Sequence, residues 1–344
     1  MMQRVEKTFA GRKLVIETGR MAKQAAGSAL VQFGDTMVLA AVTVSETKSP
    51  LDFFPLLVEY REKTYAAGKI PGGYIKREGR PSDREILSAR IVDRSIRPLF
   101  PEGFANEVQC FIYIISADQE NDSDVLALVA ASAALNVSKI PFPAPCASVR
   151  VGRIQDKWVL NPTFQQLAYS DMELVVAGTA DSINMVEGGA LEVSEDDVVE
   201  ALKVAQKGIR ELIAAQEELL KQIGAERPKK MDWEKASIAN EISVKVKAAA
   251  EGKIKEALNQ KDKHGRIAAV EKVKKDVAEA LAADFPDNGK DIKALLGDVE
   301  YNQLRSQVLD TGLRVDGRKP AEVRPITIDT GLLPRAHGSA LFTR

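Results

Sequence analysis

GRPSDREILSARIVDRSIRPLFPEGF, residues 79–104, is the stretch of this 344-residue chain that decides its fold. A helix is predicted to begin after Ser82, because a serine N-cap followed three residues later by Glu85 forms a capping box. The helix is expected to end before Pro98, since a proline disfavours helical backbone in the residue that precedes it. A capped helix is therefore the first element that the sequence predicts together with both of its ends.

Four arginines lie on this predicted helix, namely Arg84, Arg90, Arg94 and Arg97. The last three are spaced by four and then three residues, so they share one helix face. Such a face either forms a structural salt-bridge network with nearby carboxylates such as Glu85 and Asp93, or binds phosphate through guanidinium groups. The spacing alone leaves both interpretations open.

The segment before the helix, residues 72–80, reads GGYIKREGR. Its glycines predict a mobile loop, on which Tyr74 stands beside the cations Lys76, Arg77 and Arg80. An aromatic ring that stacks on bases, beside cations that bind phosphates, can grip single-stranded nucleic acid without reading sequence. An ordinary solvated loop is the alternative. Between residues 60 and 97, ten Lys or Arg face five acidic residues, whereas the whole chain has a net charge of −1, so an anion site must be a local patch.

The sequence on either side of this region alternates between strand and helix patterns. Strands are predicted at 14–16, 29–33, 36–44, 53–60, 108–116, 149–151, 158–160 and 172–177. A helix rich in alanine is predicted at about 122–137, where its composition suits burial against a sheet. A long helix begins after Ser194 and ends at Gly224. We expect an α/β or α+β domain through about residue 225.

Residues 232–310 differ in composition, because Lys, Glu and Ala dominate with helical periodicity. This pattern predicts a small all-helical domain. Its charge density is interpreted as solvated helix faces rather than as a binding tail.

Three short blocks near the start recur in the same order about 310 residues later. They pair Gly11-Arg12-Lys13 with Gly317-Arg318-Lys319, residues 16–19 with 328–331, and residues 27–30 with 338–341. A spacing this long indicates duplication of a large domain rather than a solenoid, whose period is roughly 20–50 residues. The second copy stops at Arg344, so we expect the chain to be a fragment.

Cys110 and Cys146 lie in apolar stretches, and their spacing matches no paired-cysteine motif. This pattern predicts buried free thiols in a reducing compartment. The N-terminus lacks the continuous apolar core of a signal peptide, and no run reaches the ~20 apolar residues of a membrane span. These features predict a cytoplasmic protein with no membrane partner.

An acidic cluster precedes the second predicted helix, at residues 118–124. Its oxygen ligands suit magnesium, whereas an acidic first turn that caps the helix is the blander interpretation. The chain has two histidines and contains neither a G-x-x-x-x-G-K-[ST] phosphate loop nor Cys/His metal spacing.

These motifs resemble one known family. Residues 72–101 and 29–36, VLNPT at 159–163 and VVAGT at 175–179 are similar to the first RNase PH-type core domain of bacterial polynucleotide phosphorylases, and residues 313–344 resemble the opening of the second core domain. The resemblance implies an α/β (α+β) fold, with an RNase PH-like domain of the ribosomal protein S5 domain 2-like type at 1–225. It also implies an all-helical domain at 226–310 and a truncated second RNase PH-like repeat at 311–344.

Members of that family degrade single-stranded RNA from its 3′ end, use inorganic phosphate as co-substrate, release nucleoside diphosphates and need Mg²⁺. They form ring-shaped homotrimers around an RNA channel, and components of RNA-degradation complexes are further partners. The resemblance implies this polyribonucleotide nucleotidyltransferase activity for the parent protein. The other hypothesis is a catalytically inactive RNA-binding or assembly subunit of an exosome-like ring.

Residue by residue, the loop at 72–80 matches the family loop that enters the RNA channel, although Ile75 replaces an aromatic residue and Lys76 an arginine. Arg335, His337 and Arg344 fall in a segment that lies near RNA in the family, with ordinary strand-flanking residues as the alternative. The predicted RNA-binding set is therefore Tyr74, Lys76, Arg77, Arg80, Arg84, Arg90, Arg94, Arg97, Arg335, His337 and Arg344.

The first copy is expected to be chemically silent. The turn at 121–124 carries carboxylates where the family's catalytic copy has a serine-rich phosphate turn, and carboxylates repel phosphate. Val175 stands where the catalytic copy has lysine. We therefore expect no catalytic or metal-binding residue in this chain, with the Mg²⁺ ligands beyond residue 344.

Overall fold

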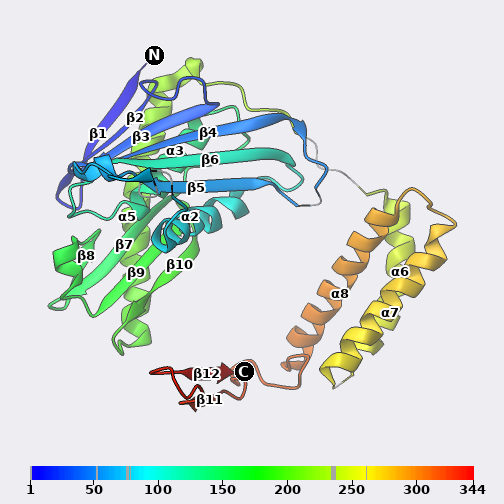
Figure 1. The fold of residues 1–344 in the computed structure, drawn as a ribbon. Helices are drawn as coiled ribbons and strands as arrows, with labels where there is room; N and C mark the ends of the chain where they lie inside the picture. The colour runs from blue at the N-terminus through cyan, green and yellow to red at the C-terminus, as the bar shows by residue number, and fades with distance from the viewer. Residues whose placement is uncertain (1, 52, 75–76, 78, 234–237, 261) are drawn as a thin grey trace. The chain divides into compact units, whose positions relative to one another are not determined.

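The computed structural model describes residues 2–51, 53–74, 77, 79–233, 238–260 and 262–344. The chain forms two compact units, Met1–Lys235 and Ala236–Arg344 (Figure 1). The first unit contains two sheets and the helices that pack on them, and the second is a helical bundle followed by a hairpin.

A six-stranded sheet forms one layer of the first unit. Its strands are β1 (Gln3–Phe9), β2 (Arg12–Thr18), β3 (Gly27–Phe33), β4 (Thr36–Lys48), β5 (Leu56–Glu62) and β6 (Asn106–Ser116). They lie in the order β1-β2-β3-β4-β6-β5, and every pair is antiparallel except β5 with β6. β5 is therefore an edge strand, and the chain leaves it to form the loop and helix that the sequence singled out.

A four-stranded antiparallel sheet completes the unit. It contains β7 (Ala147–Ile154), β8 (Lys157–Leu160), β9 (Met172–Gly178) and β10 (Ile183–Ala190), in the order β10-β9-β7-β8. The predicted strands all lie within observed ones or overlap them. β1 and β10 were not predicted from the sequence.

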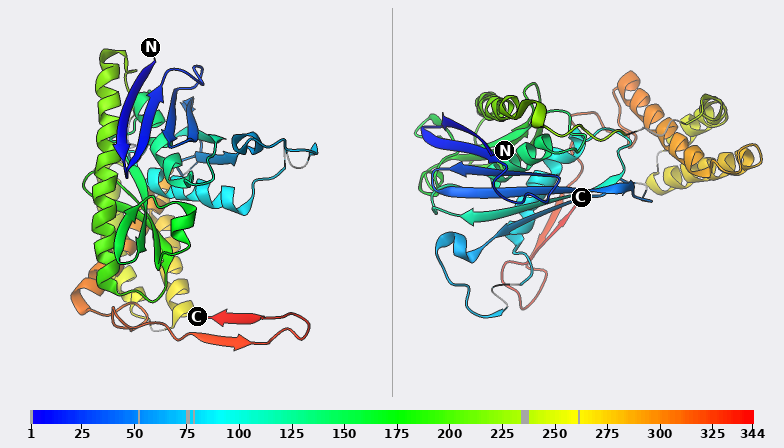
Figure 2. Two further views of the ribbon diagram at one scale, coloured as in Figure 1. Left: turned by 90° about the vertical axis from the view of Figure 1, so that its left-hand side faces the viewer. Right: turned by 90° about the horizontal axis from the view of Figure 1, so that it is seen from above.

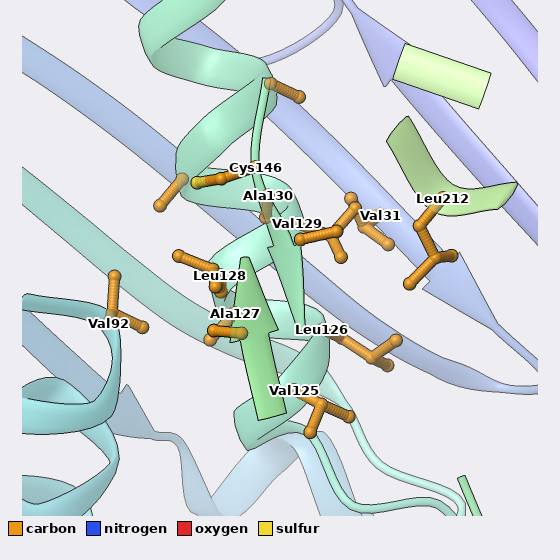
Figure 3. Close-up of a cluster of buried hydrophobic side chains, with 14 of the residues drawn as sticks. Val31, Val92, Val125, Leu126, Ala127, Leu128, Val129, Ala130, Cys146 and Leu212 are labelled. Atoms are coloured by element: carbon orange, nitrogen blue, oxygen red, sulfur yellow. The ribbon is translucent and has the colours of Figure 1, made fainter. Parts of the chain in front are cut away.

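The core is built around α3 (Asp124–Val137), every residue of which is buried. α3 packs against β3, β4 and β7, and also against α2 (Asp83–Ile96) and α5 (Glu195–Ile223). Figure 3 shows α3 residues 125–130 surrounded by Val31 of β3, Val92 of α2, Leu212 of α5, and Cys146, which directly precedes β7. The predicted buried alanine-rich helix is confirmed, as is the mixed α/β fold class.

The predicted helix ends are also confirmed. Ser82 caps α2, with a full capping box to Glu85, and α2 ends at Ile96 before the turn η2 (Arg97–Leu99). α5 begins after Ser194, whose hydroxyl accepts from the Asp197 amide at 3.2 Å, and it ends at Ile223 with Gly224 as its C-cap residue. Both cysteines are free and buried, and burial raises the pKa of each thiol to about 12.

The C-terminus of α3 is closed by the segment that follows α5 and the turn η3 (Gly224–Glu226). Lys230 Nζ donates to the carbonyl oxygens of Leu135, Asn136 and Ser138 at 3.1, 3.2 and 2.9 Å. Arg227 Nε donates to the Asn136 carbonyl at 2.9 Å. Because helix carbonyls at this end lack intrahelical donors and carry partial negative charge, these two basic side chains stabilise α3. Burial, and then the charge of Arg227, lowers the pKa of Lys230 to about 7.

Replacing this lysine should destabilise the first unit. In Lys230→Met three buried carbonyls lose a donor, so we expect the free energy of unfolding to fall by about 1–3 kcal/mol. Urea unfolding followed by tryptophan fluorescence reports on this unit alone, because both tryptophans, Trp158 and Trp233, lie in it. The control is Lys229→Met, since Lys229 is exposed and pairs with Asp232 on the surface. Equal stability of the two variants would contradict the prediction.

The second unit contains α6 (Asn240–Leu258), α7 (Lys263–Ala282) and α8 (Gly289–Thr311). α6 packs on both other helices around a separate apolar core that includes Val246, Ile254, Val277 and Leu296. A short antiparallel hairpin follows, formed by β11 (Thr327–Thr330) and β12 (Ala340–Thr343). Among the residues that the structure describes, no helix is both long and apolar enough to cross a membrane.

Candidate nucleic-acid interface

The loop that precedes α2 lies on the surface of the first unit. Tyr74 is 67% exposed, and Arg77 and Arg80 are exposed as well. In the left view of Figure 2, the described parts of the segment between β5 and α2 project from the body of this unit. Lys76 and Ile75 lie outside the described residues. The structure therefore brings Arg77 and Arg80 to one projecting segment, with Tyr74 on the same loop.

A cleft of about 590 Å³ lies beside this loop. Its walls are the C-terminal end of β5, the adjoining part of β6, the turn η1 (Thr64–Ala67), and residues 71, 77, 79 and 80 of the loop. The cleft also contains Lys63 and Tyr65, which the sequence-based set omits. Lys63 and Tyr65 lie nine and seven residues before the loop at 72–80, and a cation and an aromatic residue this close to a predicted nucleic-acid loop are a signal that could have found them.

Arg84, at the start of α2, is engaged in contacts within the protein. Its guanidinium lies 3.0 Å from Asp122 and 3.4 Å from Glu62, and it stacks over the Phe164 ring at 5.7 Å. Phe164 begins the short helix α4 (Phe164–Leu167). These contacts join α2 to the turn before α3, as the salt-bridge interpretation of the sequence expects.

Two of the other helix arginines are also paired. Arg97 donates twice to Asp93, at 2.9 and 2.6 Å, and also to the carbonyls of Phe54 and Leu56. Arg94 pairs with Glu187 of β10 at 2.6 Å.

Arg90 differs from its neighbours on α2. It is exposed, and within the part of the chain that the structure describes its guanidinium makes no ion pair or hydrogen bond. Of the four helix arginines, Arg90 is the one whose guanidinium is most available to an external anion. RNA contact by all four stays a prediction.

The acidic turn before α3 is paired with a buried arginine. Arg150 of β7 is 7% exposed and forms ion pairs with Asp124, Asp122 and Glu173, the Asp122 contact being 3.2 Å. Burial, and then repulsion by Asp122, raises the pKa of Asp124, whereas Arg150 opposes that rise. Among the described residues, no group of three or more His, Cys, Asp or Glu is placed to hold a metal.

Arg150 therefore engages two carboxylates of this turn and one of β9. Its guanidinium forms ion pairs with the carboxylates that could otherwise bind magnesium, and those same carboxylates repel phosphate. The pairing of this arginine was not predicted from the sequence. The available signal was an arginine in the apolar run Ala147–Val151, because a charge in a buried strand requires a partner.

A buried tyrosine also holds the same turn in place. The Tyr60 hydroxyl lies 2.7 Å from the Ser123 hydroxyl and donates to Glu62 at 3.0 Å. Burial, and then the charge of Glu62, raises the pKa of Tyr60 well above its ordinary value. Ser123, the serine of this turn, is thus bound within the protein.

The remaining predicted residues lie in the second unit. Arg335 and His337 are exposed in the turn between β11 and β12, and Arg344 is exposed after β12. The predicted set contains no residue of α6, α7 or α8. Acidic and basic side chains pair along those helices, for example Lys274 with Glu271 and Glu300.

Comparison with protein families matches most of the chain. Residues 10–141 match the model of the 3′ exoribonuclease family, domain 1, and residues 144–208 match domain 2 of the same family. Residues 241–319 match a model described as polyribonucleotide nucleotidyltransferase, RNA binding domain. That last match covers the helical bundle, whose charge pattern gave the sequence analysis no signal of RNA binding.

Curated proteins named polyribonucleotide nucleotidyltransferase align with the chain from end to end. The relative from Gemmatimonas aurantiaca is 74% identical over 100% of this chain and 46% of its own length. The Bacillus subtilis relative is 46% identical over 98% of this chain and 48% of its own length. The chain thus spans about half the length of the curated relatives it matches. A solved structure, "archaeoglobus fulgidus exosome with RNA bound to the active site", is 21% identical with a TM-score of 0.46, covering 62% of this chain and 86% of that one.

Proposed function

Because this chain belongs to the polyribonucleotide nucleotidyltransferase family, we propose that it forms part of a phosphorolytic 3′–5′ exoribonuclease acting on single-stranded RNA. In the whole enzyme, phosphate attacks the 3′-terminal phosphodiester and a nucleoside diphosphate leaves. The observation that carries this proposal is 74% identity, along the whole chain, to a relative bearing that name. Assembly as a homotrimer, a requirement for magnesium and a cytoplasmic location are parts of the same proposal.

Within that enzyme, the first unit is proposed to be non-catalytic. The pairing of Arg150 with Asp122, Asp124 and Glu173 supports this, because it occupies the carboxylates of the turn before α3. Neither magnesium nor phosphate fits this turn, so we assign it no step of the reaction.

The contribution of this chain is proposed to be an RNA path on the loop before α2. Arg77 and Arg80 support it, since both are exposed and form no ion pair among the described residues. Tyr74, exposed on the same loop, supplies a ring on which a base can stack. Arg90 extends the cationic surface along α2, whereas Arg84 and Arg97 act mainly in holding the protein together.

The assignment of the first unit as non-catalytic can be tested directly with the purified chain. With poly(A) and phosphate, we expect no release of ADP above the background of a reaction without phosphate, under conditions in which the chain binds RNA. Phosphate-dependent ADP release would overturn the assignment of the first unit as non-catalytic. A full-length relative assayed in parallel shows that the substrate and conditions support the reaction.

A further inference from the structure

The cleft beside the loop has a floor made by the outer face of the sheet edge. Arg61 of β5 and Tyr113 of β6 are directly opposite each other in the parallel pairing, so their side chains share this face. Lys63, just after β5, places its Nζ 5.2 Å from the centre of the Tyr113 ring. Arg77 and Arg80 line the same cleft from the loop.

The acidic residues of the cleft already have partners. Glu59 pairs with Arg61 at 2.8 Å, and Glu62 pairs with Arg84. Glu85 accepts from the backbone amides of Ser82 and Glu62, at 2.7 and 2.9 Å. These contacts leave the cations of the cleft with few acids to pair with.

Three cations in the cleft remain available to a ligand. Lys63, Arg77 and Arg80 form no ion pair within the described part of the chain. All three line the same cavity, which has a volume of about 590 Å³. An anionic group that enters the cleft therefore meets unpaired positive charge.

An aromatic ring stands at the rim of the cleft on a well-held turn. Tyr65 is 59% exposed although it belongs to η1, which is tied down at several points. The amide of Ala66 donates to the Lys63 carbonyl and that of Gly68 to the Tyr65 carbonyl, both at 2.9 Å. The amide of Ala117, after β6, donates to the Ala66 carbonyl at 2.9 Å. A ring on a backbone held this way offers a stacking surface without the cost of ordering the backbone that carries it.

We propose that this cleft is a ribonucleotide-binding pocket, in which a base stacks on Tyr65 and its phosphate lies between Lys63 and the loop arginines. Its volume falls within the ~300–1,000 Å³ typical of small-ligand sites. The inference rests on the proposed function and deepens it, because it adds a pocket for one nucleotide to the RNA path. The nucleotide is either a link of single-stranded RNA or a free nucleoside diphosphate.

The test measures binding of fluorescent oligo(A) and, by calorimetry, of ADP to the purified chain and its variants. Tyr65→Ala should weaken binding about five-fold or more, as loss of a base stack does. Tyr65→Phe keeps the ring and should bind as the unchanged chain does. Lys63→Met should lower the slope of log affinity against log salt by about one, as loss of one phosphate contact does. The matched control is Tyr169→Ala, since Tyr169 is 80% exposed and lies outside the cleft.

The two ligands identify the source of the nucleotide. If oligo(A) binding alone depends on Tyr65, the pocket holds a link of RNA, and if ADP binding also depends on it, the pocket accepts the free nucleotide. Unchanged binding of both ligands in Tyr65→Ala and Lys63→Met, with oligo(A) binding lost in Arg77→Ala/Arg80→Ala, would overturn the pocket and leave the RNA path standing. Absence of any binding to the unchanged chain would overturn both.

Discussion

Arg150→Met should be among the most destabilising substitutions in the first unit. It removes the guanidinium from Asp122 and Asp124, which are nearly buried, and from the more exposed Glu173. Leaving buried charges without their partner costs about 3–5 kcal/mol, so we expect the free energy of unfolding to fall by that amount. Urea unfolding followed by tryptophan fluorescence measures it.

Two further variants isolate the cause. Asp124→Asn in the Arg150→Met background should restore part of the stability, because it removes one of the uncompensated charges. Arg4→Met breaks an exposed pair with Glu6 and should cost less than about 1 kcal/mol. A small loss in Arg150→Met, comparable to that in Arg4→Met, would show that the pairing around Arg150 contributes little.

Gly27→Ala should also destabilise the first unit strongly. A Cβ at this position on β3 would lie 2.3 Å from the Ala134 carbonyl oxygen and 2.7 Å from the Ser138 Cβ, at the C-terminal end of α3. Backbone atoms on both sides must move to admit it, and overpacking of this kind costs about 1–3 kcal/mol or more. Urea unfolding measures the loss.

The control for this prediction is a glycine with open space. A Cβ at Gly189, in β10, would meet no atom within 4 Å, so Gly189→Ala should change the free energy of unfolding little. Equal behaviour of the two variants would contradict the packing argument. The close approach of α3 also gives a physical reason for a glycine at the start of the block 27–30.

Much of the fold could be predicted because its signals are local. The capping box of Ser82 and Glu85 lies within four residues, and the burial of α3 follows from its own composition. β1 and β10 were missed because their sequences, QRVEKTF and INMVEGGA, carry charges or glycines in place of a strong apolar pattern. β1 and β10 form strands because they pair with β2 and β9. This pairing depends on tertiary context and not on the local sequence of either strand.

The candidate site was predicted only in part, because only some of its signals are local in the sequence. A loop with an aromatic residue and cations is visible in nine consecutive residues, so Tyr74, Arg77 and Arg80 could be proposed from the sequence. The pairing of Arg150 joins β7 to a turn more than twenty residues earlier. Periodicity within either segment carries no information on such a contact, so it could not be predicted.

The central claim is that the loop before α2 supplies the RNA path of this chain, and salt-dependent binding of single-stranded oligo(A) tests it most directly. The comparison is between Arg77→Ala/Arg80→Ala and a control that removes equal charge from the exposed side of α5, Lys207→Ala/Lys221→Ala. We predict that affinity falls steeply with salt in the unchanged chain and in the control, and that the loop variant binds weakly with a salt slope lower by about two. Equal affinity and equal slope in both variants would contradict the account.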